Sequence, residues 1–319
     1  MFSIVLELPE SLAFLTGEVK QKLEEQGCYV TVIHSEKPLD IDIKRSLLKT
    51  TNVYVIGSNE IVTDNDFEDA KLLRLVQCFG AGYENVNCQA ASQKGIYVAN
   101  IPGINANSVA DLTMGLILAL VRPIVKADTF LKKGMWCFWI GHELAGKTLG
   151  IFGLGAIGKA VALRAQAHKM GVIAYDIKPD LEFSKKQEIQ LVSKTQLLEM
   201  ADVITLHMPL TEETHNFISK SELDRIKPTA YIVNTSRGGL IDQTALVEKL
   251  RKKQIAGAAL DVFTKEPLPS ADEILSLDNV VLTPHIGGLT FEALERLAEV
   301  VVENSLRIKR GEPPLYMVN

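Results

Sequence analysis

The architecture of this 319-residue chain follows from one stretch, GKTLGIFGLGAIG at residues 146–158, continued by a helix-like run over 159–170 and by VIAYD at 172–176. The apolar segments before the glycines and after the run predict two strands, so the stretch indicates one βαβ unit. Its G-x-G-x-x-G pattern allows a tight turn, close approach of the backbone to a pyrophosphate, and packing of the helix on the strand. The N–H groups at the helix start also favour phosphate. We therefore predict a dinucleotide site formed by Gly153, Leu154, Gly155, Ala156, Ile157 and Gly158.

Asp176 ends the second strand of this unit and is expected to select the cofactor. Its carboxylate can accept hydrogen bonds from the adenosine ribose hydroxyls of NAD, whereas the 2′-phosphate of NADP would bring negative charge against it. Lys178, two residues further on, could soften that repulsion. The sequence therefore predicts NAD as the cofactor, with NADP less favoured.

Composition narrows the class of protein. A chain of 319 residues, with 47% hydrophobic and 23% charged residues, has the length and balance of a globular protein of two domains. The net charge of −5 gives no basic surplus, so we expect neither a nucleic-acid partner nor binding to an anionic membrane. The four cysteines form no C-x-x-C pair, the amino terminus has no basic n-region, and no histidine spacing suits a metal. These features predict a cytoplasmic protein without a metal site.

Strand-like and helix-like segments alternate in both halves of the chain. The pattern before the glycine stretch predicts one parallel sheet and the pattern after it predicts a second, so the fold class is α/β. The remaining segments expected to be strands are residues 4–6, 29–33, 53–56, 73–78, 96–99, 203–207, 231–234, 256–260 and 280–283. The remaining segments expected to be helices are residues 18–26, 41–49, 108–121, 195–200, 243–252 and 290–309.

Two apolar segments precede the glycine stretch. Residues 108–121 are apolar nearly all round, which predicts a helix buried on more than one side, between domains or in a subunit interface. Trp136, Phe138 and Trp139 follow. Such large aromatic side chains predict core or interdomain packing, with stacking on a bulky apolar substrate as the alternative.

Three ionisable residues, Arg237, Glu266 and His285, each follow the carboxyl end of an expected strand. In an open α/β sheet these ends converge on the ligand crevice, so side chains far apart in sequence can meet there. Taken singly, each is more often a surface or capping group than a catalyst. Beside a nicotinamide site, the three together indicate an apparatus for hydride transfer.

Several separate motifs make the chain resemble the D-isomer-specific 2-hydroxyacid dehydrogenase family over nearly its whole length. They occur in the order that this family shows. The motifs are GAG at 80–82, NIPG at 100–103, SVAD at 108–111, the glycine stretch, MPLT at 208–211, residues 234–242, GAALDVF at 257–263 with Glu266-Pro267, and PHIGG at 284–288.

This resemblance implies two Rossmann-like or flavodoxin-like parallel-sheet domains, with the NAD-binding domain inserted into the substrate domain. Residues 1–103 and 290–319 would form the substrate domain, and residues 104–289 the NAD-binding domain. The protein would be a homodimer formed largely through the NAD-binding domain. The implied activity is the NAD-dependent interconversion of a small 2-keto acid and its D-2-hydroxy acid.

The same resemblance implies roles for individual side chains. Arg237 would clamp the substrate carboxylate and carbonyl, a role suited to a planar, bidentate cation. His285 would act as general acid and base, and Glu266 would hold the imidazole and stabilise its charged form. Ala81 and Gly82 match the loop whose backbone N–H groups receive the substrate carboxylate.

The cofactor contacts implied by the resemblance extend over the second half of the chain. Asp261 has an alternative role, as an acid at a strand end that caps the next turn. Beyond the glycine turn and Asp176, the implied contacts are Met208, Pro209, Thr214, Thr235, Ser236, Arg237, Asp261, His285 and Gly287.

Two features bear on the choice among related activities. Cys78-Phe79 stand where phosphoglycerate dehydrogenases have an arginine, which predicts a substrate without a phosphate. Glu266 disfavours formate dehydrogenation, because that branch has a glutamine beside the histidine, whereas phosphite oxidation stays open. A regulator is the rival from another class, since the resemblance extends to NAD-sensing transcriptional corepressors with the same fold.

Overall fold

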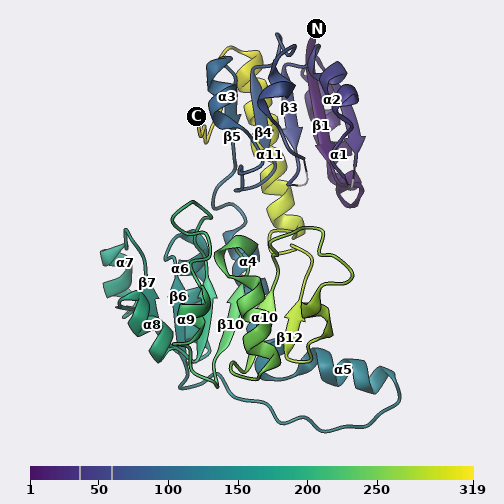
Figure 1. The fold of residues 1–319 in the computed structure, drawn as a ribbon. Coiled ribbons are helices and arrows are strands. Elements are labelled where there is room, and N and C mark those ends of the chain that lie inside the picture. The colour runs from purple at the N-terminus through teal and green to yellow at the C-terminus, as the bar shows by residue number, and fades with distance from the viewer. Residues whose placement is uncertain (36, 59) are drawn as a thin grey trace. The chain divides into compact units, whose positions relative to one another are not determined.

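The computed structural model describes residues 1–35, 37–58 and 60–319 (Figure 1). The chain divides into two compact units. The first comprises Met1–Asn105 and Gly288–Asn319, and the second, Ala106–Gly287, is inserted between those two segments in the sequence. Each unit is built on one parallel sheet, which confirms the predicted α/β class.

The first unit holds a five-stranded parallel sheet in the order β2-β1-β3-β4-β5. This order is flavodoxin-like, because the chain moves outward from β1 in both directions. The strands are β1 (Phe2–Leu8), β2 (Cys28–His34), β3 (Val53–Ile56), β4 (Leu75–Cys78) and β5 (Tyr97–Ala99). The helices are α1 (Ala13–Glu25), α2 (Ile41–Leu48), α3 (Cys88–Gln93) and α11 (Phe291–Lys309), with the 3-10 turns η1 (Glu10–Leu12) and η2 (Asp64–Phe67).

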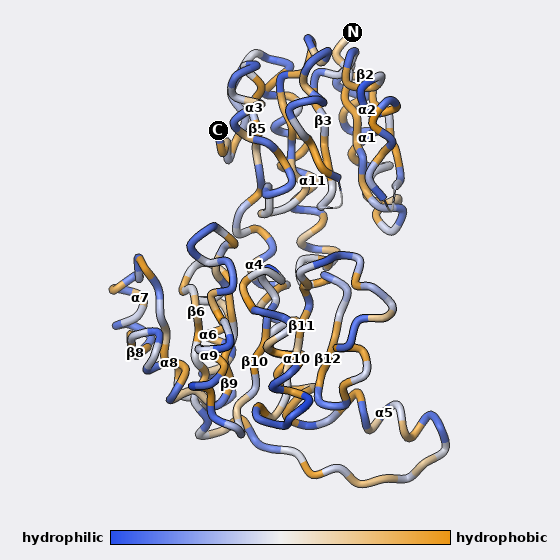
Figure 2. The backbone as a smooth tube through the Cα atoms, in the orientation of Figure 1, coloured by the Kyte–Doolittle hydropathy of each residue, from blue (hydrophilic) through white to orange (hydrophobic). Residues whose placement is uncertain are grey.

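Successive side chains of β1 supply two separate layers of core in this unit. Ile4 and Leu6 belong to a buried cluster completed by α1 and α11, whereas Val5 belongs to a cluster completed by α2 and α3. Because helices cover both faces of the sheet, the strands are apolar on both sides. Figure 2 shows hydrophobic colour along these strands. This explains why the strands are so readily recognised in the sequence.

The second unit holds a seven-stranded parallel sheet in the order β12-β11-β10-β9-β6-β7-β8. The first six strands of the unit follow the Rossmann order, and β12 extends the sheet by one strand. The strands are β6 (Thr148–Phe152), β7 (Gly171–Tyr175), β8 (Gln190–Leu191), β9 (Val203–Leu206), β10 (Tyr231–Asn234), β11 (Gly257–Leu260) and β12 (Val280–Leu282). The helices are α4 (Ala106–Val121), α5 (Ile124–Lys132), α6 (Ala156–Ala167), α7 (Leu181–Lys186), α8 (Lys194–Met200), α9 (Lys220–Leu223) and α10 (Gln243–Arg251), with the 3-10 turns η3 (Gly238–Leu240) and η4 (Glu273–Ser276).

The central strand β6 is packed on both faces. Leu149 and Ile151 join a buried cluster with α4 and α6, and Phe152 joins a second cluster with α8 and α10. At Gly150 a Cβ atom would lie 2.6 Å from the Leu197 side chain, so the missing side chain lets α8 approach the strand. The sheet that carries the glycine turn is therefore rigidly held.

Each predicted strand is present, with both ends within two residues of the expected positions. The helix after the glycines begins at Ala156 rather than at Lys159, so the last glycine of the motif lies inside the first helical turn. Helix α1 begins at Ala13, five residues before the predicted start. Short elements that the sequence did not predict are α3, α5, α7, α9 and β8.

Helix α4 packs against β10, β11, β12 and α6, so it is buried on more than one side, as predicted. The prediction of core packing for the aromatic segment after α5 is wrong. Trp136 and Phe138 are 78% and 87% exposed, and Figure 1 shows this segment projecting from the second unit. Trp139 meets Phe130 edge to face and lies under the Lys126 ammonium.

In the described part of the chain, no single helix is long and apolar enough to cross a membrane. Helices α4 and α5 are long and apolar enough only when taken as a pair, and they are bent by 66° relative to one another. Over the same residues, no group of three or more His, Cys, Asp or Glu side chains is arranged to hold a metal ion.

Candidate active site in the second unit

The glycine turn lies at the point where the strand order of the second sheet reverses. Strands β7 and β8 follow β6 on one side, and β9 to β12 extend on the other. Ligands of open α/β sheets bind outside the carboxyl ends of the strands at such a switch point. The turns after β6 and β9 flank this point, so they are expected to border a bound dinucleotide.

The three motif glycines differ in what a side chain would meet. At Gly153, which has φ of +91°, a Cβ atom would lie 2.4 Å from the His207 carbonyl oxygen. At Gly158 it would lie 2.1 Å from the carbonyl oxygen of Gly153. At Gly155, by contrast, nothing lies within 4 Å. Two glycines are thus required by internal packing, and the third leaves the backbone open to a ligand.

Helix α6 begins directly at this open backbone. Its N-cap, Gly155, provides no side-chain hydrogen bond, and the Lys159 N–H makes the first helical bond, 2.9 Å from the Gly155 carbonyl oxygen. The N–H groups of Ala156, Ile157 and Gly158 precede that bond and therefore lack helical acceptors. Free N–H groups at a helix N-terminus suit a pyrophosphate, so the turn fits the predicted cofactor.

Asp176 is joined to the glycine turn by hydrogen bonds. Its Oδ2 accepts from the Leu154 N–H at 2.7 Å, and its Oδ1 accepts from the Lys178 N–H at 2.7 Å. The carboxylate therefore fixes the turn and keeps further lone pairs for ribose hydroxyls. The structure brings Asp176 and Leu154 together as the sequence motif requires.

The predicted contacts after β9 and β10 make hydrogen bonds within the second unit. The Thr214 hydroxyl donates to the Pro209 carbonyl oxygen at 2.7 Å and closes the turn after β9. Thr235 and Ser236 are buried; the Thr235 hydroxyl lies 2.9 Å from that of Thr113 in α4, and the Ser236 hydroxyl donates to the Leu206 carbonyl oxygen at 2.7 Å. These bonds fix the backbone at the carboxyl edge of the sheet.

His285 and Glu266 meet at the ends of β12 and β11. The imidazole Nδ1 lies 2.7 Å from Glu266 Oε2, and Glu266 Oε1 accepts a hydrogen bond of 2.9 Å from the Phe263 N–H. Because Nδ1 faces the carboxylate, Nε2 is the nitrogen left to exchange a proton with a ligand. Both side chains stay about one-third exposed, so a small substrate can reach them.

Glu266 is held as a carboxylate. Burial alone would raise its pKa, but the hydrogen bond and charge of His285, the Phe263 N–H and the charge of Arg237 outweigh that effect and lower the pKa below its usual value. Its negative charge therefore lies beside the His285 ring, 2.7 Å from Nδ1.

Arg237 reaches the same region because Gly238 allows two loops to touch. A Cβ atom at Gly238 would lie 1.9 Å from the Phe263 carbonyl carbon, so only glycine permits this approach. The Asn234 side chain donates to the Arg237 carbonyl oxygen at 2.8 Å and secures the loop after β10. Neither residue was singled out from the sequence, although the glycine pair directly after a strand was a signal for close backbone approach.

Asp261 holds the turn that carries His285. Its Oδ1 accepts from the Thr283 hydroxyl at 2.6 Å and from the Ile286 N–H at 2.9 Å, while Oδ2 accepts from the Gly287 N–H at 2.8 Å. The side chain is 1% exposed, and His285 adopts the left-handed backbone with φ of +54°. These contacts match the capping role considered as the alternative to a cofactor contact.

In the first unit, the loop that contains Ala81 and Gly82 is fixed by its carbonyl groups. The Gly80 carbonyl oxygen accepts from the Ile101 N–H at 2.7 Å, and the Ala81 carbonyl oxygen accepts from the Asn100 side chain at 2.7 Å. Within residues 1–35, 37–58 and 60–319, the N–H groups of Ala81 and Gly82 donate no hydrogen bond. The loop therefore presents two free donors.

Comparisons with known proteins agree with this geometry. The family model described as the NAD-binding domain of D-isomer specific 2-hydroxyacid dehydrogenases matches residues 114–287. The glyoxylate reductase of Korarchaeum cryptofilum is 43% identical over 259 residues, which cover 79% of this chain and 78% of that protein. The glyoxylate reductase of Pyrococcus horikoshii is 37% identical over 318 residues, which cover 96% of this chain and 95% of that protein.

A solved structure extends the similarity to the whole fold. The TT0316 protein of Thermus thermophilus has a TM-score of 0.91 and 35% sequence identity, with both chains covered completely. The extent of these matches confirms the resemblance inferred from the motifs and the NAD-type cofactor inferred from the glycine turn. The chain belongs to the D-isomer specific 2-hydroxyacid dehydrogenase family and is an NAD(P)-dependent oxidoreductase with that family's NAD-binding domain.

Proposed function

We propose that this protein reduces small, non-phosphorylated 2-keto acids, glyoxylate among them, with NADH, and that it oxidises the corresponding D-2-hydroxy acids in reverse. The observation that carries the proposal is the contact of 2.7 Å between His285 and Glu266 at the carboxyl edge of the sheet that holds the glycine turn. The names of the two glyoxylate reductases support the choice of substrate class. The two free N–H groups of the Ala81 loop support a carboxylate ligand.

In this proposal His285 supplies the proton. NADH, when bound, would supply the hydride to the keto carbon. As the carbonyl oxygen gains negative charge, the N–H bond at His285 Nε2 breaks and the new O–H bond forms. The Glu266 carboxylate stabilises the imidazolium before transfer, and its contact with Nδ1 fixes the ring. In the oxidation direction, neutral His285 takes the hydroxyl proton.

In the same proposal, the Arg237 side chain and two backbone N–H groups orient the substrate. The Arg237 guanidinium provides paired N–H donors of fixed geometry for the carboxylate and the carbonyl oxygen. Ala81 and Gly82 would donate their backbone N–H groups to the carboxylate. The dinucleotide would be bordered by Met208, Pro209 and Thr214. Its nicotinamide end would be bordered by Thr235, Ser236, Asp261 and Gly287.

The substrate class is tested by following NADH oxidation with the purified full chain and a panel of keto acids. Glyoxylate, hydroxypyruvate, pyruvate, phenylpyruvate and 2-ketoisocaproate are compared with 3-phosphohydroxypyruvate. We expect a non-phosphorylated acid to give the highest kcat/KM, because Cys78-Phe79 offer no cation for a phosphate. Preference for the phosphorylated acid would contradict this, and NADH binding without turnover of any acid would favour a regulator instead.

Cofactor preference is expected to depend on Asp176. Wild-type protein should have a higher kcat/KM for NADH than for NADPH, and Asp176→Ala should narrow that ratio by removing repulsion toward the 2′-phosphate. The same variant also loses the hydrogen bonds to Leu154 and Lys178, so its activity with NADH should fall. The ratio of the two kcat/KM values is the readout, and a wild-type preference for NADPH would contradict the assignment.

We propose further that the protein is a homodimer and that the second copy covers the apolar segment around α5. Exposed apolar side chains cluster there, and patches of this kind mark protein–protein interfaces. A two-fold dimer would cover the same patch on both copies. The exposed residues are Ile124, Val125, Leu131, Met135, Trp136, Phe138 and Ile140.

Light scattering after size exclusion tests this assembly. Wild-type protein should elute with twice the chain mass, whereas the double variant Trp136→Ser with Phe138→Ser should shift toward the mass of one chain. Leu181→Ser is the matched control, because Leu181 is 67% exposed on α7, away from this segment in sequence. A monomeric wild type, or a double variant that stays dimeric, would contradict the proposal.

A further inference from the structure

A second switch point lies in the sheet of the first unit, where β2 and β3 flank β1. A small pocket opens at the carboxyl ends of these strands. It is lined by Glu7, Pro9, Ser35, Lys37, Gly57 and Glu60. Glu7 and Glu60 are only 4% and 2% exposed, so this pocket contains two nearly buried carboxyl groups.

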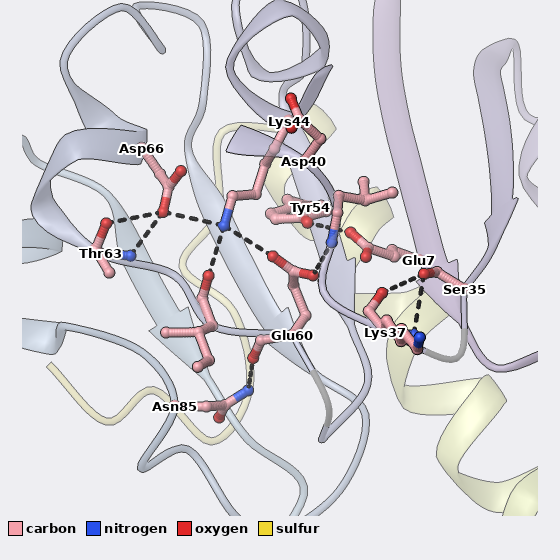
Figure 3. A network of polar contacts seen from close by, with 12 residues as sticks. Glu7, Ser35, Lys37, Asp40, Lys44, Tyr54, Glu60, Thr63, Asp66 and Asn85 are labelled. Carbon is pink, nitrogen blue, oxygen red and sulfur yellow. Dashed lines mark hydrogen bonds and ion pairs between the residues drawn. The ribbon is translucent and has the colours of Figure 1, made fainter. Parts of the chain in front are cut away.

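Polar contacts surround both carboxyl groups (Figure 3). The Tyr54 hydroxyl donates to Glu7 Oε2, and Glu7 lines the same small pocket as Glu60. Lys44 Nζ lies 2.8 Å from Glu60 Oε1 and 3.2 Å from Asp66 Oδ2, and it donates to the Ile61 carbonyl oxygen at 2.6 Å. Glu60 Oε2 also accepts from the Leu39 N–H at 3.0 Å.

The network holds three acids and one buried cation. Glu7 comes from β1, Glu60 from the loop after β3, and Asp66 from η2, while Lys44 of α2 is the only buried ammonium among the described residues that contacts them. Tyr54 of β3 is a neutral donor. Lys37, in the pocket wall, is exposed. One ammonium cannot balance three buried carboxylates, so one acid is expected to keep its proton.

Glu7 is the acid of this network whose pKa is raised. Burial, and then its contact with Glu60, raise the pKa of Glu7 to about 8, although the Tyr54 hydroxyl and the charge of Lys44 act in the opposite direction. A protonated Glu7 has a donor to offer Glu60 and keeps an acceptor for Tyr54. The open pocket beside it gives this proton a path to solvent.

The backbone at Glu60 supports the loop that carries Ala81 and Gly82. The Asn85 side chain donates to the Glu60 carbonyl oxygen, and the Asn85 carbonyl oxygen accepts from the Val62 N–H at 2.9 Å. Asn85 is three residues beyond Gly82 in the same loop, between β4 and α3. One of these bonds ends on Glu60 and the other on Val62, so two hydrogen bonds tie the backbone of this segment to the loop.

We propose that Glu7 is a positioning residue which, through a proton shared with Glu60, holds the loop of Ala81 and Gly82 in the conformation that receives the substrate carboxylate. The proposal rests on the function proposed above. When the proton leaves, two carboxylates face one another in a buried site, and their repulsion displaces the Glu60 backbone and the loop. Substrate affinity then falls while the NAD-binding unit is unaffected.

The kinetic test compares wild type, Glu7→Gln and the control Glu18→Gln as full chains with saturating NADH. Glutamine keeps the donor toward Glu60 and the acceptor for Tyr54 but has no proton to lose. Glu18 is an exposed residue of α1. KM and kcat for glyoxylate are measured below and above pH 8, together with the Kd for NADH.

Above pH 8 the KM for glyoxylate should rise in wild type and in Glu18→Gln. This rise should be roughly three- to tenfold larger than the rise in Glu7→Gln, which is the change expected when one hydrogen bond is lost. His285 is present in all three proteins, so the difference between the curves isolates Glu7. The Kd for NADH should be alike in all three. Superimposable KM curves for wild type and Glu7→Gln, with active enzymes, would overturn the inference and leave the proposed function intact.

Infrared difference spectra test the proton without catalysis. Wild type at neutral pH should show the C=O stretch of a protonated carboxylic acid, which disappears on titration above pH 8 and is absent from Glu7→Gln. A wild type without that band would overturn the shared proton even if Glu7→Gln failed to fold. A wild type that shows the band but reduces no keto acid would refute the proposed function, and with it the loop's role, while leaving the proton assigned.

Discussion

Replacing His285 by alanine is expected to lower kcat for keto-acid reduction by roughly 10²–10⁴-fold, the usual contribution of a positioned general acid. The variant loses the proton donor at Nε2 but none of the hydrogen bonds that shape the glycine turn. NADH affinity should therefore stay close to that of wild type. Steady-state kinetics and titration of NADH fluorescence measure the two quantities separately, and a variant that keeps wild-type kcat would refute the assignment.

Glu266→Gln provides the contrasting variant, because it keeps the shape of the side chain and removes its charge. Without the carboxylate, the ring loses the negative charge that faces Nδ1 and stabilises its charged form. The alkaline limb of the reduction profile and the acidic limb of the oxidation profile should both move to lower pH. Profiles that stay in place would show that the contact of 2.7 Å does not couple the two groups.

Replacing Lys44 by methionine is expected to cost about 3–5 kcal/mol of unfolding free energy, the range found when one partner of a buried ion pair is removed. Lys44 is 6% exposed and neutralises both Glu60 and Asp66. Methionine has a similar length and leaves these two carboxylates without a cation. Part of the loss should be recovered at acidic pH, where the carboxylates can take up protons.

Urea unfolding of Lys44→Met at two pH values measures this effect. Lys49→Met is the matched control, because Lys49 caps the same helix and pairs with Asp69 at 3.4 Å with both side chains more than half exposed. An exposed pair of this kind contributes at most about 1 kcal/mol. Equal losses for the two variants would show that the buried network does not stabilise the first unit.

The sequence predicted the strands well because their apolar patterns are local and helices cover both faces of each sheet. It placed the start of α6 three residues late for a physical reason. Gly155 and Gly158 have low intrinsic helix propensity, so they read as a turn, whereas tertiary packing draws Gly158 into the helix. The same glycines identified the βαβ unit correctly, because their spacing reflects contacts within that unit.

What the sequence missed depends on contacts between distant segments. Nothing local shows that Gly238 must accommodate Phe263, or that Glu7 lies beside Glu60. The prediction for the aromatic segment at Trp136 and Phe138 was wrong for a different reason. Trp136 and Phe138 have the composition of a core, but they are exposed and follow α5, a helix without a buried residue.

The turn of His285 has a consequence for anyone who would transplant this chemistry to another scaffold. The histidine backbone is in the left-handed region, and the bonds that keep it there end on Asp261, a residue of the neighbouring strand end. Copying three side chains onto a new protein would therefore place an imidazole on a turn that relaxes away. A transplanted site would need both adjacent strand ends, with Asp261 included, because the sheet positions the turn that orients the His285 ring.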